Sequence, residues 1–212
     1  MPYPFVHPTA QIDPGAIIRE DTIIGPHAHI GPEVCFGVHV QVGSHTSITG
    51  LVNISHRTRI GRAVILFGPL QVWNDVVIED GVSIGVWFSD TSSLKQGVIN
   101  QGAHIEASAI VLGGLSIGDY ARLWREARLE GDLPTHAAAA GQPAALVDFV
   151  CECGKLFQYK TGPGELVLCK CPSCWMEYRL ARSIFERRGK YLKPNQQAGD
   201  PVPSWWRATL GI

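Results

Sequence analysis

The sequence lacks any run of eighteen or more apolar residues, so it predicts no transmembrane helix. Its first residues, Met1-Pro2-Tyr3-Pro4, lack the basic segment followed by an apolar one that is typical of a secretory signal. Charged residues make up 17% of the chain, and 18 Lys+Arg nearly balance 19 Asp+Glu. This balance argues against a nucleic-acid-binding protein that works through bulk positive charge.

The charge is nevertheless uneven along the chain. Residues 1–150 carry 8 basic and 14 acidic side chains, a net of −6, whereas residues 151–212 carry 10 basic and 5 acidic side chains, a net of +5. Such an asymmetry indicates two modules. Five of the six cysteines lie between Cys151 and Cys174, and without an export signal this clustering favours a metal site in a reducing cytoplasm over disulfides.

The strongest pattern in the sequence has a period of six. A large apolar residue occupies every sixth position in two runs that are out of phase with each other. The first run comprises Ile12, Ile18, Ile24, Ile30, Phe36, Val42, Ile48, Ile54, Ile60, Leu66, Val72, Ile78 and Ile84, and the second comprises Ile99, Ile105, Val111, Ile117, Leu123 and Leu129. An amphipathic helix would repeat near 3.6 and a strand near 2, so neither explains this period.

Hexapeptide repeats predict an all-β chain folded as a parallel β-helix, in which each hexapeptide forms a short strand and a corner and three complete a coil. About six coils would form a prism roughly 30 Å tall with the aliphatic residues inside. Glycine follows the inward residue at several corners, among them Gly25, Gly43 and Gly61, where we expect it to permit positive φ. The interval from Ile84 to Ile99 is not a multiple of six, which predicts that part of residues 86–97 loops out of the coil.

Three short motifs resemble those of a known family. The opening His7-Pro8-Thr9-Ala10 resembles that of the left-handed β-helix hexapeptide-repeat acyltransferases. Val72-Trp73-Asn74-Asp75 and Gly141-Gln142-Pro143-Ala144 resemble the branch that N-acetylates nucleotide-linked amino sugars for surface-glycan synthesis. The resemblance spans residues 5–180. It implies a left-handed coil over residues 5–145, a cytoplasmic homotrimer, and acetyl-CoA bound between neighbouring subunits as the acyl donor to a nucleotide sugar.

The hexapeptide period ends near Pro143, and a cysteine-rich segment follows. Two knuckles, Cys151-Glu152-Cys153 and Cys171-Pro172-Ser173-Cys174, flank a predicted hairpin, and this pattern is typical of a zinc ribbon. We expect residues 146–182 to form this module around a structural Zn²⁺ bound by Cys151, Cys153, Cys171 and Cys174, with Cys169 as the spare. Residues 183–212 form a polar tail, in which Trp205-Trp206 is expected to contact a neighbouring subunit.

Acetyl transfer to an amine requires a base, an anchor for the amine and a channel for acyl-CoA. The predicted loop after Gly85 contains Asp90 but no histidine, which leaves Asp90, His104 and Asn74 as the candidate catalytic residues. The candidates for holding acyl-CoA are Gly113, Gly114, Arg122, Arg125, Gly141, Gln142, Pro143 and Ala144.

Two other functions stay open at this stage. Trp124 and Glu126 stand where the resembling family has small glycines beside the acyl-CoA channel, and Phe67-Gly68-Pro69 replaces polar residues of its sugar pocket. These departures favour a non-catalytic trimeric scaffold or ligand-binding protein. A β-helical carbonic anhydrase would use histidines between subunits, and His27 and His45 are predicted to stack on adjacent coils, but the His-x4-His pair of that family is missing.

Overall fold

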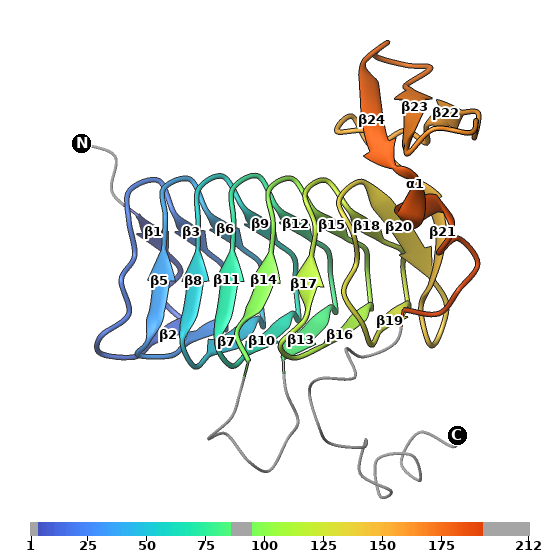
Figure 1. Ribbon diagram of the computed structural model, residues 1–212. Coiled ribbons are helices and arrows are strands. Elements are labelled where there is room, and N and C mark those ends of the chain that lie inside the picture. Colours follow the sequence, from blue (N-terminus) through green and yellow to red (C-terminus); the bar gives the residue numbers. More distant parts are fainter. Residues whose placement is uncertain (1–3, 86–94, 193–212) are drawn as a thin grey trace, which may run out of the picture.

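The computed structural model describes residues 4–85 and 95–192, and these form a parallel β-helix with a small module at its C-terminal end (Figure 1). Three parallel sheets run along the prism. Sheet 1 contains β1 (Phe5–Val6), β3 (Ile23–Ile24), β6 (Gln41–Val42), β9 (Arg59–Ile60), β12 (Val77–Ile78), β15 (His104–Ile105), β18 (Arg122–Leu123), β20 (Ala137–Ala140) and β21 (Ala145–Phe149). Sheet 2 contains β2 (Gln11–Ile12), β4 (His29–Ile30), β7 (Ser47–Thr49), β10 (Ile65–Phe67), β13 (Ser83–Gly85), β16 (Ile110–Leu112) and β19 (Arg128–Leu129).

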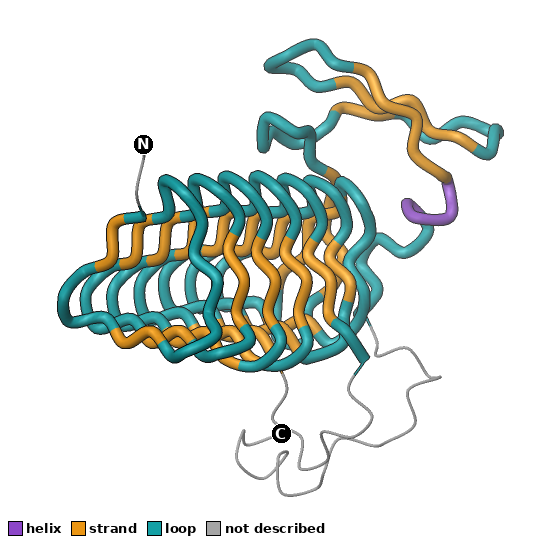
Figure 2. The backbone as a smooth tube through the Cα atoms, turned by 90° about the vertical axis from the view of Figure 1, so that its left-hand side faces the viewer, coloured by secondary structure: helices purple, strands orange, loops and turns teal. Residues whose placement is uncertain are grey.

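Sheet 3 is the shortest. It contains β5 (Val34–Phe36), β8 (Val52–Ile54), β11 (Leu70–Val72), β14 (Gly97–Ile99) and β17 (Ser116–Ile117). The chain visits sheets 1, 2 and 3 in turn, and Figure 2 shows the resulting coils stacked along one axis. Successive strands of a sheet pair in parallel, and each residue lies beside its equivalent three hexapeptides along the chain, as Ile48 does with Leu66. The predicted parallel β-helix is therefore confirmed.

The solenoid has about seven turns rather than the predicted six. The prediction counted only the uninterrupted apolar runs from Ile12 to Leu129. The structure adds β1 before the first run and β20 after the second, where small alanines replace the large apolar residues. The last strand, β21, reverses direction and pairs antiparallel with β20.

The core is the predicted column of apolar residues. Seventeen of its nineteen members are buried, and the other two, Ile12 and Ile18, lie in the first coil and are partly buried against it. A second buried column escaped the sequence analysis. It stands two residues before each inward residue and consists of small side chains such as Ala28, Val64 and Thr46.

The corner glycines have a different role from the one predicted. Of the glycines that follow an inward residue, Gly25, Gly43 and Gly61 have ordinary φ values, and left-handed corners instead hold residues such as His27 (φ 57°) and Asp75 (φ 60°). A Cβ on Gly43 would collide with the carbonyl group of Gly61 in the next coil. Glycine is therefore required by the close approach of stacked coils, not by positive φ.

The C-terminal module, residues 151–192, projects from the end of the solenoid (Figure 1). Its sheet is antiparallel, in the order β22 (Gln158–Tyr159), β23 (Leu166–Lys170) and β24 (Glu177–Ala181), and the short helix α1 (Arg182–Phe185) follows. The chain then returns to β21, where Tyr191 bridges Ala145. No helix among the residues described has the length and apolar character needed to span a bilayer.

Candidate functional site

One coil of the solenoid is longer than the others. Leu66 pairs with Ile84, three hexapeptides later, whereas Ile84 pairs with Val111 rather than with Gly102, so this coil carries nine additional residues. The additional residues enter between the end of β13 at Gly85 and the start of β14 at Gly97. The break in hexapeptide phase therefore located the insertion. Asp90 and most of the predicted loop lie outside the described residues.

A shallow depression lies beside this insertion, at the corner between sheets 2 and 3. Its lining includes Gly85, Gly97, Gly113 and Gly114 together with Phe67. Its volume of about 10 Å³ is room for about one water molecule, so a single chain encloses no site for an acyl thioester. The two predicted acyl-CoA glycines, Gly113 and Gly114, thus lie at the inserted coil.

Exposed apolar side chains surround the depression. Ile65 and Ile110 lie on the outer face of sheet 2, on either side of Ser83, and are 41% and 37% exposed. Phe67 is 40% exposed and also lines the depression. Water-exposed aliphatic and aromatic groups gathered on one face are typical of a surface that another protein covers.

His104 lies on the outer face of β15 and has a carboxylate partner. Its Nε2 is 2.7 Å from Oε1 of Glu79, whose second oxygen accepts the backbone N–H of Ala107 at 3.0 Å. A neutral imidazole that donates Nε2–H to a carboxylate keeps a lone pair on Nδ1, as a general base requires. Glu79 was missed from the sequence, although the register that pairs Ile78 with Ile105 places it one coil below Glu106.

Asn74 lies in the corner between sheets 3 and 1. Its Oδ1 accepts the backbone N–H of His56 at 3.0 Å, so its carbonyl links two adjacent coils. Gly113 and Gly114 occupy the corner between sheets 2 and 3, and His104 lies on sheet 1. Within one chain, the structure therefore does not gather the predicted amine-binding residues around the predicted acyl-CoA glycines.

The two predicted phosphate-binding arginines meet Glu106. The guanidinium group of Arg122 donates from Nε to Oε1 of Glu106 at 2.6 Å and from Nη1 to the carbonyl oxygen of Gly154 at 3.2 Å. The backbone N–H of Arg125 donates to Oε2 of Glu106, and the Arg125 side chain is exposed. Arg122 thus holds the C-terminal module against sheet 1, whereas Arg125 faces solvent.

Residues 141–144 form the tight connection between β20 and β21. The side-chain amide of Gln142 donates to the carbonyl oxygen of Glu126, and Ala144 is fully buried. Glu126 has a positive φ of 58° and is exposed, while Trp124 is half-buried. The predicted closing turn is therefore fixed to the corner that carries Glu126.

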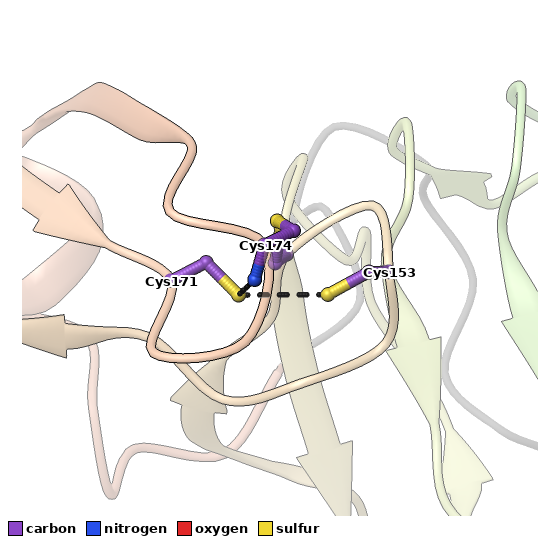
Figure 3. A group of neighbouring side chains, drawn as sticks. Cys153, Cys171 and Cys174 are labelled. Atoms are coloured by element: carbon purple, nitrogen blue, oxygen red, sulfur yellow. Dashed lines mark hydrogen bonds between the residues drawn. The ribbon is translucent and has the colours of Figure 1, made fainter.

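Four cysteine thiols gather where the module meets the solenoid. Sγ of Cys151 is 3.4 Å from that of Cys174, Sγ of Cys153 is 3.5 Å from that of Cys171, and all four lie within 4.8 Å of one another. Figure 3 shows Cys153 and Cys171 pointing toward each other from two separate loops. Cys169 is buried within β23 and lies outside the cluster. Among the residues described, these four form the one group of three or more His, Cys, Asp or Glu side chains with metal-binding spacing.

The thiols differ in acidity because their surroundings differ. The backbone N–H groups of Cys174 and Ser173 donate to Sγ of Cys171 and lower the pKa of that thiol to about 6. Burial raises the pKa of Cys151 to about 12 and that of Cys169 to about 11. A thiolate at Cys171 is thus stabilised by the turn that carries it.

An aromatic cluster joins the module to the last coil. The ring of His136 is 4.7 Å from Tyr178 and 5.6 Å from Phe157, both in the module, and stacks on Tyr120 at 5.5 Å. His136 is 6% exposed, and its Nδ1–H donates to the carbonyl oxygen of Val150 at 2.9 Å. Burial lowers the pKa of His136, so the folded protein holds this imidazole neutral.

We expect this junction to weaken in mild acid. The unfolded imidazole titrates near about pH 6.5, and the folded one at lower pH, so the unfolded chain binds the proton more readily between the two values. The contribution of His136 is complete above the unfolded pKa and is lost as pH falls through the folded one. Thermal unfolding midpoints measured between pH 8 and pH 5 should fall less in the His136→Asn variant, which keeps a residue that tolerates positive φ. Equal slopes in both proteins would contradict the assignment.

The other histidines line the corners. The rings of His27 and His45 stack with centroids 4.9 Å apart, as predicted for residues one coil apart, and His39 lies 3.3 Å from a carboxylate oxygen of Asp21. All three have positive φ, so they occupy corners rather than strands.

Comparison with known proteins finds acetyltransferases. The chain is 33% identical over 61 residues to a dTDP-3-amino-3,6-dideoxy-α-D-galactopyranose 3-N-acetyltransferase of Aneurinibacillus thermoaerophilus, covering 29% of this chain and 32% of that protein. It is 32% identical over 104 residues to a serine acetyltransferase of Haemophilus influenzae, covering 45% of this chain and 39% of that protein. The chain thus spans about a third to two fifths of the length of these relatives.

Solved structures of similar shape carry related names. LpxA from Acinetobacter baumannii superposes with a TM-score of 0.48 at 20% sequence identity, over 68% of this chain and 74% of that one. No family profile matches the chain. The unbroken hexapeptide period, the parallel three-sheet solenoid and the sequence matches to acetyltransferases identify the chain as a member of the hexapeptide-repeat acyltransferase family.

Proposed function

We propose that the protein is an acyl-CoA-dependent N-acyltransferase that acts on a nucleotide-linked amino sugar, and that it works as a homotrimer in the reducing cytoplasm. The observation that carries the proposal is the coil enlarged by nine residues beside a glycine-lined corner. In solenoid proteins, insertions into single repeats form loops on the binding face. The match to an amino-sugar N-acetyltransferase supports the class of acceptor.

The reaction joins an amine nitrogen to the carbonyl carbon of a thioester. As the C–N bond forms, the C–S bond breaks, CoA leaves as a thiolate, and the amine loses a proton. His104 is the proposed base, because Glu79 holds its Nε2–H and leaves Nδ1 as the acceptor. Asn74 and Asp90 are the proposed anchors of the amino sugar, and Asn74 keeps its side-chain NH₂ group for this purpose because Oδ1 already binds His56.

Gly113 and Gly114 are proposed to line the path of the acyl chain, and Arg125 to bind a CoA phosphate. Glycine lets a ligand approach the backbone closely, and Arg125 is exposed where Arg122 is engaged with Glu106. The turn Gly141-Gln142-Pro143-Ala144 is proposed to contact the distal part of the CoA.

The proposed trimer accounts for two features of the single chain. The depression is too small for a thioester, and the apolar residues Ile65, Phe67 and Ile110 beside it are exposed. A neighbouring subunit would cover these residues and supply the opposite wall, so that residues on different faces of one chain meet across an interface. Light scattering should give a mass near three times 23.1 kDa, and a species of 23.1 kDa at micromolar concentration would reject the trimer.

Calorimetry with acetyl-CoA tests the activity most directly. Saturable binding supports the transferase, and absence of binding at millimolar ligand rejects it. If the protein does not bind acetyl-CoA, the paired substitutions Trp124→Gly and Glu126→Gly test whether these side chains block the channel.

Once turnover is detected, His104→Gln should lower kcat by about 10²–10⁴-fold with a smaller change in KM, because it removes the base and keeps the residue's size. His29→Gln is the matched control, since His29 also pairs with a carboxylate, that of Asp13, but lies on sheet 2 near the N-terminal end. Equal losses in both variants would remove His104 from the reaction.

We propose a structural Zn²⁺ as a second cofactor, bound by Cys151, Cys153, Cys171 and Cys174. Four thiolates leave no open coordination position for chemistry, so this ion would serve folding rather than acyl transfer. The close grouping of the four thiols supports the site.

A further inference from the structure

We infer that the four thiols bind Zn²⁺ as a crosslink between two parts of the protein, fastening the C-terminal module to the last coil of the solenoid. The inference rests on the proposed structural zinc and is independent of the proposed acyl transfer. It follows from the positions of the two cysteine knuckles, from the donors around the sulfurs, and from the few contacts that otherwise hold the module.

The sulfur positions fit one tetrahedral ion. Four thiolates about 2.3 Å from a Zn²⁺ ion lie about 3.8 Å from one another at the corners of a tetrahedron. The measured separations begin at 3.4 Å for Cys151 and Cys174 and 3.5 Å for Cys153 and Cys171, and none of the others exceeds 4.8 Å. These values bracket the tetrahedral edge, so an ion needs only small side-chain rotations.

The donors around the sulfurs suit thiolates. Sγ of Cys171 accepts backbone N–H groups from Ser173 at 3.4 Å and from Cys174 at 3.5 Å, and the second of these contacts is drawn in Figure 3. The hydroxyl group of Tyr178 donates to Sγ of Cys151 at 3.9 Å. Such outer contacts orient metal-binding thiolates and spread their negative charge.

The donor set selects the ion. Sulfur ligands favour Zn²⁺ and other thiophilic metals over Mg²⁺ and Ca²⁺, which prefer oxygen. Cys151 and Cys171 are at most 1% exposed, so two of the four ligands are closed to solvent. The arrangement is that of a permanent site rather than of a passing surface contact.

The two knuckles belong to different parts of the protein. Cys151 directly follows β21, and Val150 before it is tied to His136 of the last coil by two hydrogen bonds, one through the backbone at 2.7 Å and one through Nδ1 at 2.9 Å. Gly154, just after Cys153, accepts a hydrogen bond from Arg122 of β18. The first knuckle is therefore anchored to the solenoid.

The second knuckle belongs to the module. Cys171 and Cys174 lie between β23 and β24, at the end of the hairpin. The module is too small to fold on its own core, because the outward side chains of its central strand include Leu166 and Leu168, which are 56% and 53% exposed. An ion shared by both knuckles thus joins the hairpin to the anchored segment.

The coupling extends into the solenoid by one strand. β21 leads to Cys151 and pairs with β20, and the two strands are joined by residues 141–144. Releasing the first knuckle therefore frees the end of β21 and loosens its pairing, whereas the coils around Leu66 share no contact with it. Metal loss should open the C-terminal end of the protein and leave the middle intact.

Metal content provides the first test, and it needs no substrate. Protein purified without chelator should contain one Zn²⁺ per chain by elemental analysis, and replacement by Co²⁺ should give the visible absorption of a tetrahedral tetrathiolate site. Cys153→Ser and Cys174→Ser, both at exposed positions, should lose the ion, whereas Cys35→Ser, on sheet 3, should retain it. Absence of metal together with no Co²⁺ spectrum would overturn the inference, as would two disulfides in freshly purified protein.

Hydrogen exchange tests the crosslink itself. After chelation, amide exchange should rise at least tenfold in residues 145–181 and stay unchanged in β7, β10 and β13. The Cys174→Ser variant should reproduce this pattern without chelator. Faster exchange confined to residues 151–181, with β21 still protected, would contradict the crosslink while leaving the metal site itself supported. Acetyl-CoA binding enters neither measurement, so failure here and failure of the proposed activity are distinguishable.

Discussion

Replacing Leu66 with alanine should lower the free energy of unfolding by about 2–5 kcal/mol, the range typical of a large aliphatic side chain removed from a closed core. Leu66 is fully buried in β10, where its partners in the neighbouring coils are Ile48 and Ile84. Coils of a solenoid contact only their neighbours, so the cavity cannot be filled from elsewhere. Chemical denaturation with an unchanged m-value would measure the loss.

The adjacent residue is a matched control. Ile65 lies on the same strand but faces outward and is 41% exposed, so Ile65→Ala should cost less than about 1 kcal/mol within one subunit. If the proposed trimer covers Ile65, the cost of this substitution should depend on protein concentration, whereas that of Leu66→Ala should not. Equal, concentration-independent losses would contradict the alternation of inward and outward residues.

Adding a methyl group at a corner glycine should be as damaging as removing a core side chain. The Cβ of Gly43→Ala would collide with the carbonyl group of Gly61, which belongs to the backbone of the next coil and cannot rotate away. We expect a loss of about 3 kcal/mol or more, at the upper end of the cost of overpacking. Thermal unfolding of the purified variant provides the measurement.

Gly162→Ala is the control for this substitution. An added Cβ at Gly162 has no atom within 4 Å, and its φ is not in the left-handed region, so the expected change lies within about 0.5 kcal/mol. A similar loss at both positions would mean that the coils do not approach each other as closely as the structure shows.

The fold could be predicted because one physical requirement repeats. Each coil must bury an aliphatic side chain at the same place, so the residues from Ile12 to Ile84 display the period without a break, and the change of phase before Ile99 marks the insertion. The number of turns was less predictable. At the C-terminal end, the buried strand β20 consists of alanines, which satisfy the narrow interior without the apolar signal that the period relies on.

The candidate site could be predicted only in part. The four clustered cysteines stand at recognisable spacings, and the structure brings their thiols together. The partner of His104 was not recognised, because Glu79 lies on the preceding coil, across a coil of unusual length. The link from Asn74 to His56 was missed for another reason: a side chain that bridges two coils has no signature in its own hexapeptide.

The reversal of β21 makes the two ends of the prism unequal. A parallel solenoid offers its terminal backbone groups to any similar strand, and two molecules stacked head to tail would continue the same sheets as a filament. Here β21 runs against β20, and residues Gly141 and Ala144 occupy the backbone groups of Arg128 in β19. Because head-to-tail growth needs one end of each kind, blocking the C-terminal end alone is enough to stop polymerisation, even though β1 and β2 remain the outermost strands at the other end.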